Sequence, residues 1–249
     1  MDTEEIGKLC ALEDRHWWYA ARRGVLRRQV AAFTGDRCGP GRALDVGAAG
    51  GGNTRVLTDL GWTATAVEQD APAAAVARHR GLRVARADAV NLPVAPGSMD
   101  LVVAMDVMEH LDDDRAAMAA WAAILAPGGR LLITVPADPA LWSAHDVAVG
   151  HRRRYVAVEL RALATAAGVQ VVDLWSWNVA LRPAIAWRRR QSTGSDLDHV
   201  PGPLNLALRA VVEAERLVRP MRRWPGVTLV LVADRPAGGV SPATPTAPR

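Results

Sequence analysis

Short apolar runs alternate with longer segments of helical periodicity through the first two thirds of the chain. Runs that are apolar at successive positions are typical of strands covered on both faces of a parallel sheet. The pattern predicts strands near residues 42–46, 64–68, 82–86, 100–104 and 130–135. Between them it predicts helices near residues 52–60, 71–79 and 112–126. This alternation indicates an α/β fold with a doubly wound parallel sheet.

The flanking segments add helices and two more strands. Residues 3–33 are expected to form one or two helices, and a helix near 156–167 leads to a strand at 169–175. Another helix is expected near 203–219, before the apolar run 227–233 that predicts the last strand. From residue 236 onward small and polar residues dominate, which predicts a disordered tail. The resulting parts are N-terminal helices 1–35, a core 36–175, an insertion 176–225, a final strand 226–235 and a tail 236–249.

Composition restricts the class of protein. The 249 residues are 50% hydrophobic, enough for one large core and a small accessory region. We find no run of ~18 uncharged apolar residues, so no transmembrane helix is expected. Cys10 and Cys38 are too few for a disulfide framework, which favours a cytoplasmic protein. The net charge of +4 comes almost wholly from arginine, a bias typical of a GC-rich genome, so nucleic acid is not expected as a partner.

A glycine-rich turn carries the strongest chemical signal. The predicted strand 42–46 breaks into Gly47–Gly52, where side chains are nearly absent and a ligand can lie directly on the backbone. Asn53 and Thr54 then offer capping groups for a helix. About twenty residues on, the next strand ends in Glu68, where a carboxylate usually binds the two hydroxyls of a ribose. A cofactor that carries a nucleoside is therefore expected at this edge of the sheet.

Three features decide between the cofactors that such a turn can bind. Gly47-x-Ala49-x-x-Gly52 loosely matches a dinucleotide fingerprint, but Asp45 stands in the strand end, where it would repel a pyrophosphate and attract an amino group. Asp88 follows the third strand, within reach of an exocyclic adenine amine. Lys8 is the only lysine, so the Tyr-x-x-x-Lys pair of short-chain dehydrogenases is absent from the sequence. The balance favours S-adenosylmethionine.

Five motifs in order resemble the class I S-adenosylmethionine-dependent methyltransferases, of the small-molecule type related to the ubiquinone-biosynthesis enzymes. They are Leu44-Asp-Val-Gly-Ala-Ala-Gly-Gly51, Ala66-Val-Glu-Gln-Asp70, Arg86-Ala-Asp-Ala89, the stretch Ser98–Leu111 and Leu125–Pro136. The resemblance implies a Rossmann-like seven-stranded sheet with an antiparallel last strand, and S-adenosylhomocysteine as product. Ala49 departs from the family, which usually has glycine there; we expect slightly weaker binding at most. The implied cofactor contacts are Tyr19, Arg22, Asp45, Gly47, Ala48, Ala49, Gly51, Glu68, Gln69, Asp88, Ala89 and Met105.

The N-terminal helices contain the aromatic and basic segment Glu13–Arg23. In relatives a comparable segment folds over the cofactor as a lid. By that resemblance Tyr19, Arg22 or Arg23 reaches the methionine carboxylate of the cofactor, while Trp17 and Trp18 shield its sulfonium from water. The alternative is that both tryptophans only dock the helix on the sheet. Adjacent helical positions point ~100° apart, so one ring can pack while the other faces the ligand.

A second segment, Trp142–Tyr155, follows the fifth strand and is the main candidate for acceptor chemistry. His145 beside Asp146 is the leading candidate for a general base, because imidazole titrates near neutral pH. His151 and Tyr155 are further candidates, by similarity to relatives. His110, after the fourth strand, faces either the acceptor or the protein interior. The alternative for the charged residues of this segment is a solvated loop or ion pairs with the lid.

The expected activity is transfer of a methyl group to O or N of a small-molecule, glycan-linked or hydrophobic acceptor. The apolar, aromatic and basic insertion 176–225 suits a substrate cap, a homodimer interface or a peripheral membrane contact. Three other functions stay open from the sequence: an RNA methyltransferase, a non-catalytic S-adenosylmethionine-binding partner protein and, with least support, a dehydrogenase. No metal is expected.

Overall fold

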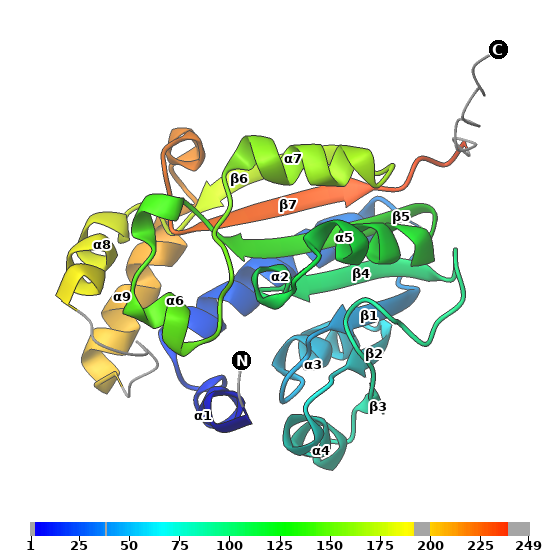
Figure 1. Ribbon diagram of the computed structural model, residues 1–249, viewed down its shortest axis with the longest axis horizontal. Coiled ribbons are helices and arrows are strands. Elements are labelled where there is room, and N and C mark those ends of the chain that lie inside the picture. Colours follow the sequence, from blue (N-terminus) through cyan, green and yellow to red (C-terminus); the bar gives the residue numbers. More distant parts are fainter. Residues whose placement is uncertain (1–2, 38, 192–199, 239–249) are drawn as a thin grey trace.

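The computed structural model describes residues 3–37, 39–191 and 200–238 (Figure 1). Within these residues one sheet has the strand order β3-β2-β1-β4-β5-β7-β6. Its strands are β1 (Arg42–Val46), β2 (Thr63–Val67), β3 (Arg83–Ala85), β4 (Met99–Met105), β5 (Leu125–Pro136), β6 (Gln170–Trp177) and β7 (Thr228–Asp234). Neighbours from β3 to β5 are parallel, and β7 runs antiparallel to both β5 and β6. The expected Rossmann-like sheet with an antiparallel last strand is confirmed.

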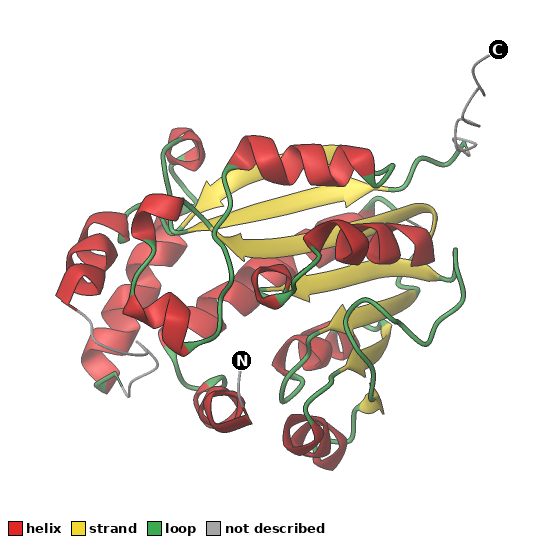
Figure 2. Ribbon diagram, in the orientation of Figure 1, coloured by secondary structure: helices red, strands yellow, loops and turns green. Residues whose placement is uncertain are grey.

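Helices cover both faces of this sheet (Figure 2). On one face α2 (Trp17–Gly35) and α3 (Gly52–Asp59) join the core cluster that contains Leu101 and Leu132. On the other, α5 (Asp114–Ile124) and α7 (Ala157–Ala166) join the cluster that contains Val102 and Leu131. Successive strand residues point to opposite faces, so strands buried on both sides are apolar at nearly every position. This packing explains why apolar runs located the strands.

Element boundaries follow local chemistry where the sequence provides it. Helix α4 (Ala71–His79) has the predicted bounds, because the Asp70 side chain accepts the N–H of Ala73 at 2.9 Å and caps its first turn. At α3 the capping expectation is wrong: Gly51 is the N-cap residue and makes no side-chain capping bond. Asn53 and Thr54 lie inside that helix instead. The hydroxyl of Thr54 is engaged elsewhere, by Asp45.

Strand β5 begins five residues earlier than predicted. Leu125 pairs with Met99, and the ladder resumes with Arg130 opposite Leu101, so a bulge holds the intervening residues. Gly128, with φ of 74°, takes the left-handed conformation that such an irregularity requires. The backbone distortion at Pro127-Gly128-Gly129 lies within the strand rather than before it.

The two N-terminal helices play different parts. Helix α1 (Thr3–Leu12) contacts α4, whereas α2 buries Leu26 and Val30 against the sheet. Only the first turns of α2 reach the carboxyl edge of the strands, where Trp17, Trp18 and Tyr19 lie. The segment therefore combines the two alternatives from the sequence: most of α2 docks, and its N-terminal end faces the site.

The insertion is helical and packs on α2. It contains α8 (Arg182–Gln191), α9 (Gly202–Glu215) and the short η3 (Arg219–Arg223). Asn205 of α9 accepts the backbone N–H of Trp17 at 2.6 Å, and Glu213 pairs with Arg28 at 3.1 Å. Helix α9 ends four residues before the predicted limit. No helix in the described part of the chain is long and apolar enough to cross a membrane, and most of the predicted tail, residues 239–249, lies outside it.

Candidate active site

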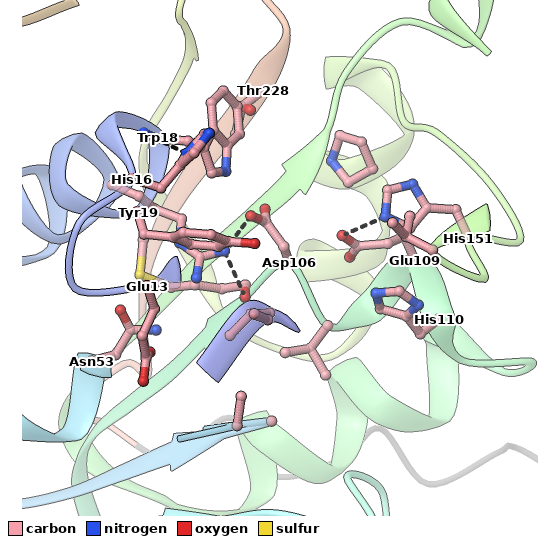
Figure 3. Close-up of a pocket in the computed structure, with 18 of the residues that line it drawn as sticks. Glu13, His16, Trp18, Tyr19, Asn53, Asp106, Glu109, His110, His151 and Thr228 are labelled. Atoms are coloured by element: carbon pink, nitrogen blue, oxygen red, sulfur yellow. Dashed lines mark hydrogen bonds and ion pairs between the residues drawn. The ribbon is translucent and has the colours of Figure 1, made fainter. Parts of the chain in front are cut away.

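A cavity of about 910 Å³ lies at the carboxyl ends of the parallel strands. Figure 3 shows residues from the N-terminal segment and from several strand ends that face it. Open α/β sheets bind ligands at this edge. Most of the site residues expected from the sequence line it: Tyr19, Arg22, Gly47, Ala48, Ala49, Glu68, Gln69, Ala89, Met105, His110, His145 and His151. Asp45, Gly51, Asp88 and Tyr155 lie outside that lining.

The turn after β1 needs its glycines. Gly47 has φ of 66°, and a Cβ on it would stand 2.6 Å from Cγ2 of Val107. Gly51 has φ of 85°, and a Cβ there would stand 2.2 Å from Cδ1 of Leu82. Ala49 also takes the left-handed conformation, with φ of 47°, at a cost of about 1–2 kcal/mol for an L-residue. The departure from the family pattern at Ala49 therefore strains the backbone of the turn.

Asp45 is completely buried next to this turn. Its Oδ2 accepts the hydroxyl hydrogen of Thr54 at 2.6 Å, and its Oδ1 has no hydrogen-bond partner in the described chain. Burial raises the pKa of Asp45 to about 7, although Thr54 and Arg22 act to lower it. A carboxylate held in this way stabilises positive charge brought near the turn.

Glu68 stands directly after β2, with its carboxylate oriented by two backbone amides. Oε2 accepts the N–H of Ala49 at 2.7 Å, and Oε1 accepts the N–H of Asp70 at 2.8 Å. Each carboxylate oxygen can accept a further hydrogen bond. The two oxygens are therefore preorganised to receive a pair of hydroxyl groups.

Asp88 holds the turn after β3 in shape, and its contact with an adenine amine stays a prediction. Oδ1 of Asp88 accepts the N–H of Val90 at 2.7 Å and that of Asn91 at 3.2 Å, so this side chain shapes the turn. The Trp121 indole donates to the carbonyl of Ala89 at 2.8 Å and fixes the next residue. Ala87 and Ala89, on either side of Asp88, line the cavity. Their methyl groups offer an apolar contact for one face of an aromatic base.

The first turns of α2 close another side of the cavity. Trp17 belongs to the core beneath α2, and the Trp18 ring lies 5.1 Å from that of Trp177 between centroids. The Arg22 guanidinium lies 5.3 Å from the centre of the Tyr19 ring and forms an ion pair with Asp106. The carboxylate of a bound amino-acid group would therefore contact an arginine side chain that Asp106 already orients.

Three histidines form one wall, contributed by η1 (Met108–His110), α6 (Ala144–Ala148) and the loop after α6. The ring centroids of His110 and His151 are 4.9 Å apart, and those of His145 and His151 are 6.2 Å apart. Burial, with the nearby His151, lowers the pKa of His110 to about 4. The sequence placed these residues 41 positions apart at most, and the fold brings them together.

Asp146 pairs with His151 rather than acting through its neighbour His145. Its Oδ1 lies 2.7 Å from Nδ1 of His151 and 2.8 Å from Nη2 of Arg154. Burial opposes ionisation, but these hydrogen bonds hold the pKa of Asp146 at about 2. Adjacency in sequence does not give the partner of Asp146, because residues i and i+1 of a helix point in different directions. The role of His145 as a general base stays a prediction.

Glu109 is a site residue that the sequence analysis did not select. It lines the cavity, is fully buried, and neither of its carboxylate oxygens has a hydrogen-bond partner in the described chain. Burial, with the carboxylate of Asp106, raises its pKa well above the usual range. Its one sequence signal was its place beside His110.

Tyr155 lies behind the wall. Its hydroxyl is 3.1 Å from Oδ2 of Asp114, and burial raises its pKa above the ordinary value. Its backbone bridges to Ala137 after β5. This placement indicates a residue that holds the 150–155 loop to the sheet.

The insertion lines the remaining side of the cavity with apolar groups and with two arginines of α8, Arg188 and Arg189. Helix α8 and the residues around it contribute Leu181, Ala184 and Ile185. Helix α9 contributes Leu204 and Leu208, and Val200 lies two residues before that helix. One continuous space therefore joins the glycine turn to the histidine wall and to an apolar surface.

Comparisons with known proteins agree with this geometry. A family model described as a methyltransferase domain matches residues 17–174. A protein of Mycolicibacterium smegmatis, named "Probable S-adenosylmethionine-dependent methyltransferase", is 26% identical over 166 residues, 65% of this chain and 63% of its own length. A ubiquinone biosynthesis O-methyltransferase of Xanthomonas campestris pv. campestris is 34% identical over 146 residues, 52% of this chain and 59% of its own length. The chain thus spans about three fifths of these two relatives.

Solved structures show the same fold. A methyltransferase from Archaeoglobus fulgidus superimposes with a TM-score of 0.61 at 17% identity, covering 85% of this chain and 92% of its own. Phosphoethanolamine N-methyltransferase 2 of Haemonchus contortus, solved with S-adenosylmethionine, gives a TM-score of 0.56 at 19% identity, covering 79% of this chain and 49% of its own. The family match covers more than half of the chain, and the chain belongs to the class I S-adenosylmethionine-dependent methyltransferases.

Proposed function

We propose that this protein transfers the methyl group of S-adenosylmethionine to an oxygen or nitrogen of a small, partly apolar acceptor. One observation carries the proposal: a single cavity joins the glycine turn and Glu68 to the histidine wall and the apolar residues of the insertion. A donor bound at the first end has room for an acceptor at the other. Relatives named for methylation of ubiquinone precursors and of phosphoethanolamine support a small-molecule acceptor.

The donor contacts follow from the site. The Glu68 carboxylate receives the ribose hydroxyls, and the adenine lies along Ala87 and Ala89. The methionine part crosses the turn at Gly47–Ala49, where Asp45 stabilises its ammonium group. Arg22, oriented by Asp106, faces its carboxylate.

Methyl transfer then depends more on alignment of the acceptor with the methyl carbon than on general acid–base catalysis. A lone pair of the acceptor forms a bond to the methyl carbon as the carbon–sulfur bond breaks, and neutral S-adenosylhomocysteine leaves. An in-line approach held within a cavity supplies much of the rate. Trp17 and Trp18 keep water from the sulfonium, while the histidine wall contacts the polar atom of the acceptor.

Calorimetric titration with S-adenosylmethionine, followed by a transfer assay with the labelled donor and a panel of apolar phenols, hydroxy acids and amines, tests the proposal. We expect micromolar binding, weakened at least about 100-fold in Glu68→Ala, because two hydrogen bonds to a charged group are lost at about 1.5–3 kcal/mol each. Asp59→Ala removes an exposed acid on α3 and serves as the matched control. Absence of donor binding, or binding without transfer to any panel member, would contradict the proposal.

A further inference from the structure

A group of metal-ligand type lies in the wall of the cavity. One ligating atom from each of Glu109, His110 and His151 lies within 4.8 Å of the other two. Two ligands come from η1 and the third from the loop after α6, so only the folded chain brings them together. Ligand atoms bound about 2.1 Å from a tetrahedral ion lie roughly 3.4 Å from one another. Side-chain adjustments on the order of 1 Å would bring all three atoms into that range.

Each imidazole already has the orientation that a metal ligand needs. Nδ1 of His151 is held by the Asp146 carboxylate at 2.7 Å, and Nδ1 of His110 lies 3.1 Å from the carbonyl oxygen of Gly150. Metal-binding histidines almost always donate one ring N–H to a carboxylate or carbonyl in this way. The second nitrogen, Nε2, is then the one available to an ion, and Nε2 of His151 is 3.7 Å from Oε1 of Glu109.

Glu109 supplies an independent observation. Its side chain is 0% exposed, and both oxygens lack a hydrogen-bond partner within the described residues. A buried carboxyl group without partners is costly and rare in folded proteins. A cation held between its oxygens and the two imidazoles would remove that cost.

The segments that carry the ligands are clamped to each other. The backbone N–H of Arg152 donates to the carbonyl of Glu109 at 2.8 Å, and the Arg152 side chain donates to the carbonyl of His110 at 2.9 Å. Arg153 adds an ion pair with Asp114 at 3.0 Å. These contacts fix the backbone positions of the three ligands relative to one another, as preorganised metal sites require.

We propose that Glu109, His110 and His151 bind one divalent transition-metal ion of the zinc, manganese or iron class, with its open positions facing the acceptor part of the cavity. Two imidazoles and one carboxylate suit these ions, whereas magnesium and calcium prefer oxygen ligands alone. Three protein ligands leave coordination positions for an exogenous group, as in catalytic sites. All three residues line the cavity, so that group is reached from the acceptor side.

The use of the ion rests on the proposed methyl transfer. An acceptor hydroxyl bound to the ion loses its proton to solvent water more readily, because the positive charge stabilises the oxyanion. The oxygen lone pair then attacks the methyl carbon as described above. Under this proposal the acceptor carries an oxygen or nitrogen that can coordinate a metal, and His151 acts as a ligand rather than as the base.

Metal binding can be measured without any acceptor. The full chain is freed of metal with a chelator and titrated by calorimetry with Zn²⁺ and separately with Mn²⁺, and bound metal is counted by mass spectrometry after gel filtration. We expect one ion per chain. Glu109→Gln and His151→Ala should each weaken binding at least 100-fold, while His79→Ala, which removes an exposed histidine on α4, should leave it unchanged.

Two further measurements, of folding and of S-adenosylmethionine binding, accompany the metal titration. Circular dichroism melting confirms that the variants fold, and Zn²⁺ should raise the Tm of the wild type but not that of Glu109→Gln. S-adenosylmethionine is titrated into the same samples, so a failure of donor binding is separated from a failure of metal binding. Absence of stoichiometric metal in the wild type, or equal affinity in wild type and both variants, would overturn the proposal.

Discussion

Replacement of Asp45 by asparagine should stabilise the cofactor-free protein at neutral pH. The pKa of this buried carboxyl is about 7 in the folded chain against an ordinary value of 3.8. Folding therefore disfavours the ionised form, and the wild type loses stability as pH rises from 3.8 towards 7. An asparagine side chain keeps an acceptor for Thr54 and never ionises. It should behave as the protonated acid does.

The size of the effect follows from the two pKa values. A gap of about three pKa units corresponds to ~4 kcal/mol when Asp45 is fully ionised. Between pH 5 and pH 8 the linkage relation gives a change of about 2.5 kcal/mol, most of it below pH 7. The neighbouring charges, Arg22 and Glu13, are present in both proteins, so they cancel to first order in the comparison.

Urea unfolding of both proteins, each without cofactor, at half-unit steps from pH 5 to pH 8 measures this. The free energy of unfolding of Asp45→Asn minus that of the wild type should rise with pH by about 2.5 kcal/mol. Titration with S-adenosylmethionine at pH 8 should show a lower affinity for the variant than for the wild type. A difference in unfolding free energy that stays constant across this range would refute the raised pKa and the reasoning built on it.

Two further predictions concern the turn and α2. Ala49→Gly should raise the free energy of unfolding by about 1 kcal/mol, because glycine adopts the left-handed conformation without strain, and should not weaken cofactor binding; a destabilised variant in urea unfolding would contradict this. Arg22→Ala should lower the free energy of unfolding by about 3 kcal/mol, because Asp106 loses its ion-pair partner. Arg27→Ala should lower it by less than about 1 kcal/mol, because its partner Asp59 is exposed. Equal losses in the two arginine variants would show that burial of the pair is unimportant.

The core of the fold was predictable because its signals are local. Apolar runs marked strands buried on both faces, and helical periodicity gave the bounds of α4, which Asp70 caps in the structure. The carboxylate of Glu68 was predictable for a similar reason, since it follows its strand directly. The start of β5 was not, because a bulge opposite β4 extends the strand through a sequence typical of a turn.

The acceptor side depends on contacts between distant segments, which local patterns do not encode. The choice between His145 and His151 as the partner of Asp146 is made by the loop after α6, which brings His151 back to a residue five positions earlier in the chain. The importance of Glu109 depends on its burial beneath that loop. No periodicity of its own segment, three residues of η1, could indicate this.

Asp45 and Glu109 both lower the free energy of unfolding of the ligand-free protein. Each is a fully buried carboxyl with at least one oxygen that lacks a partner in the described chain, and burial raises the pKa of each. Such groups destabilise the free protein, so the position of Glu109 in the cavity wall and of Asp45 next to the glycine turn indicates that ligands complete them. An ammonium group from the donor suits Asp45, and a metal ion suits Glu109. Because both ligands would bind only the folded state, each should raise the unfolding free energy in proportion to the logarithm of its concentration.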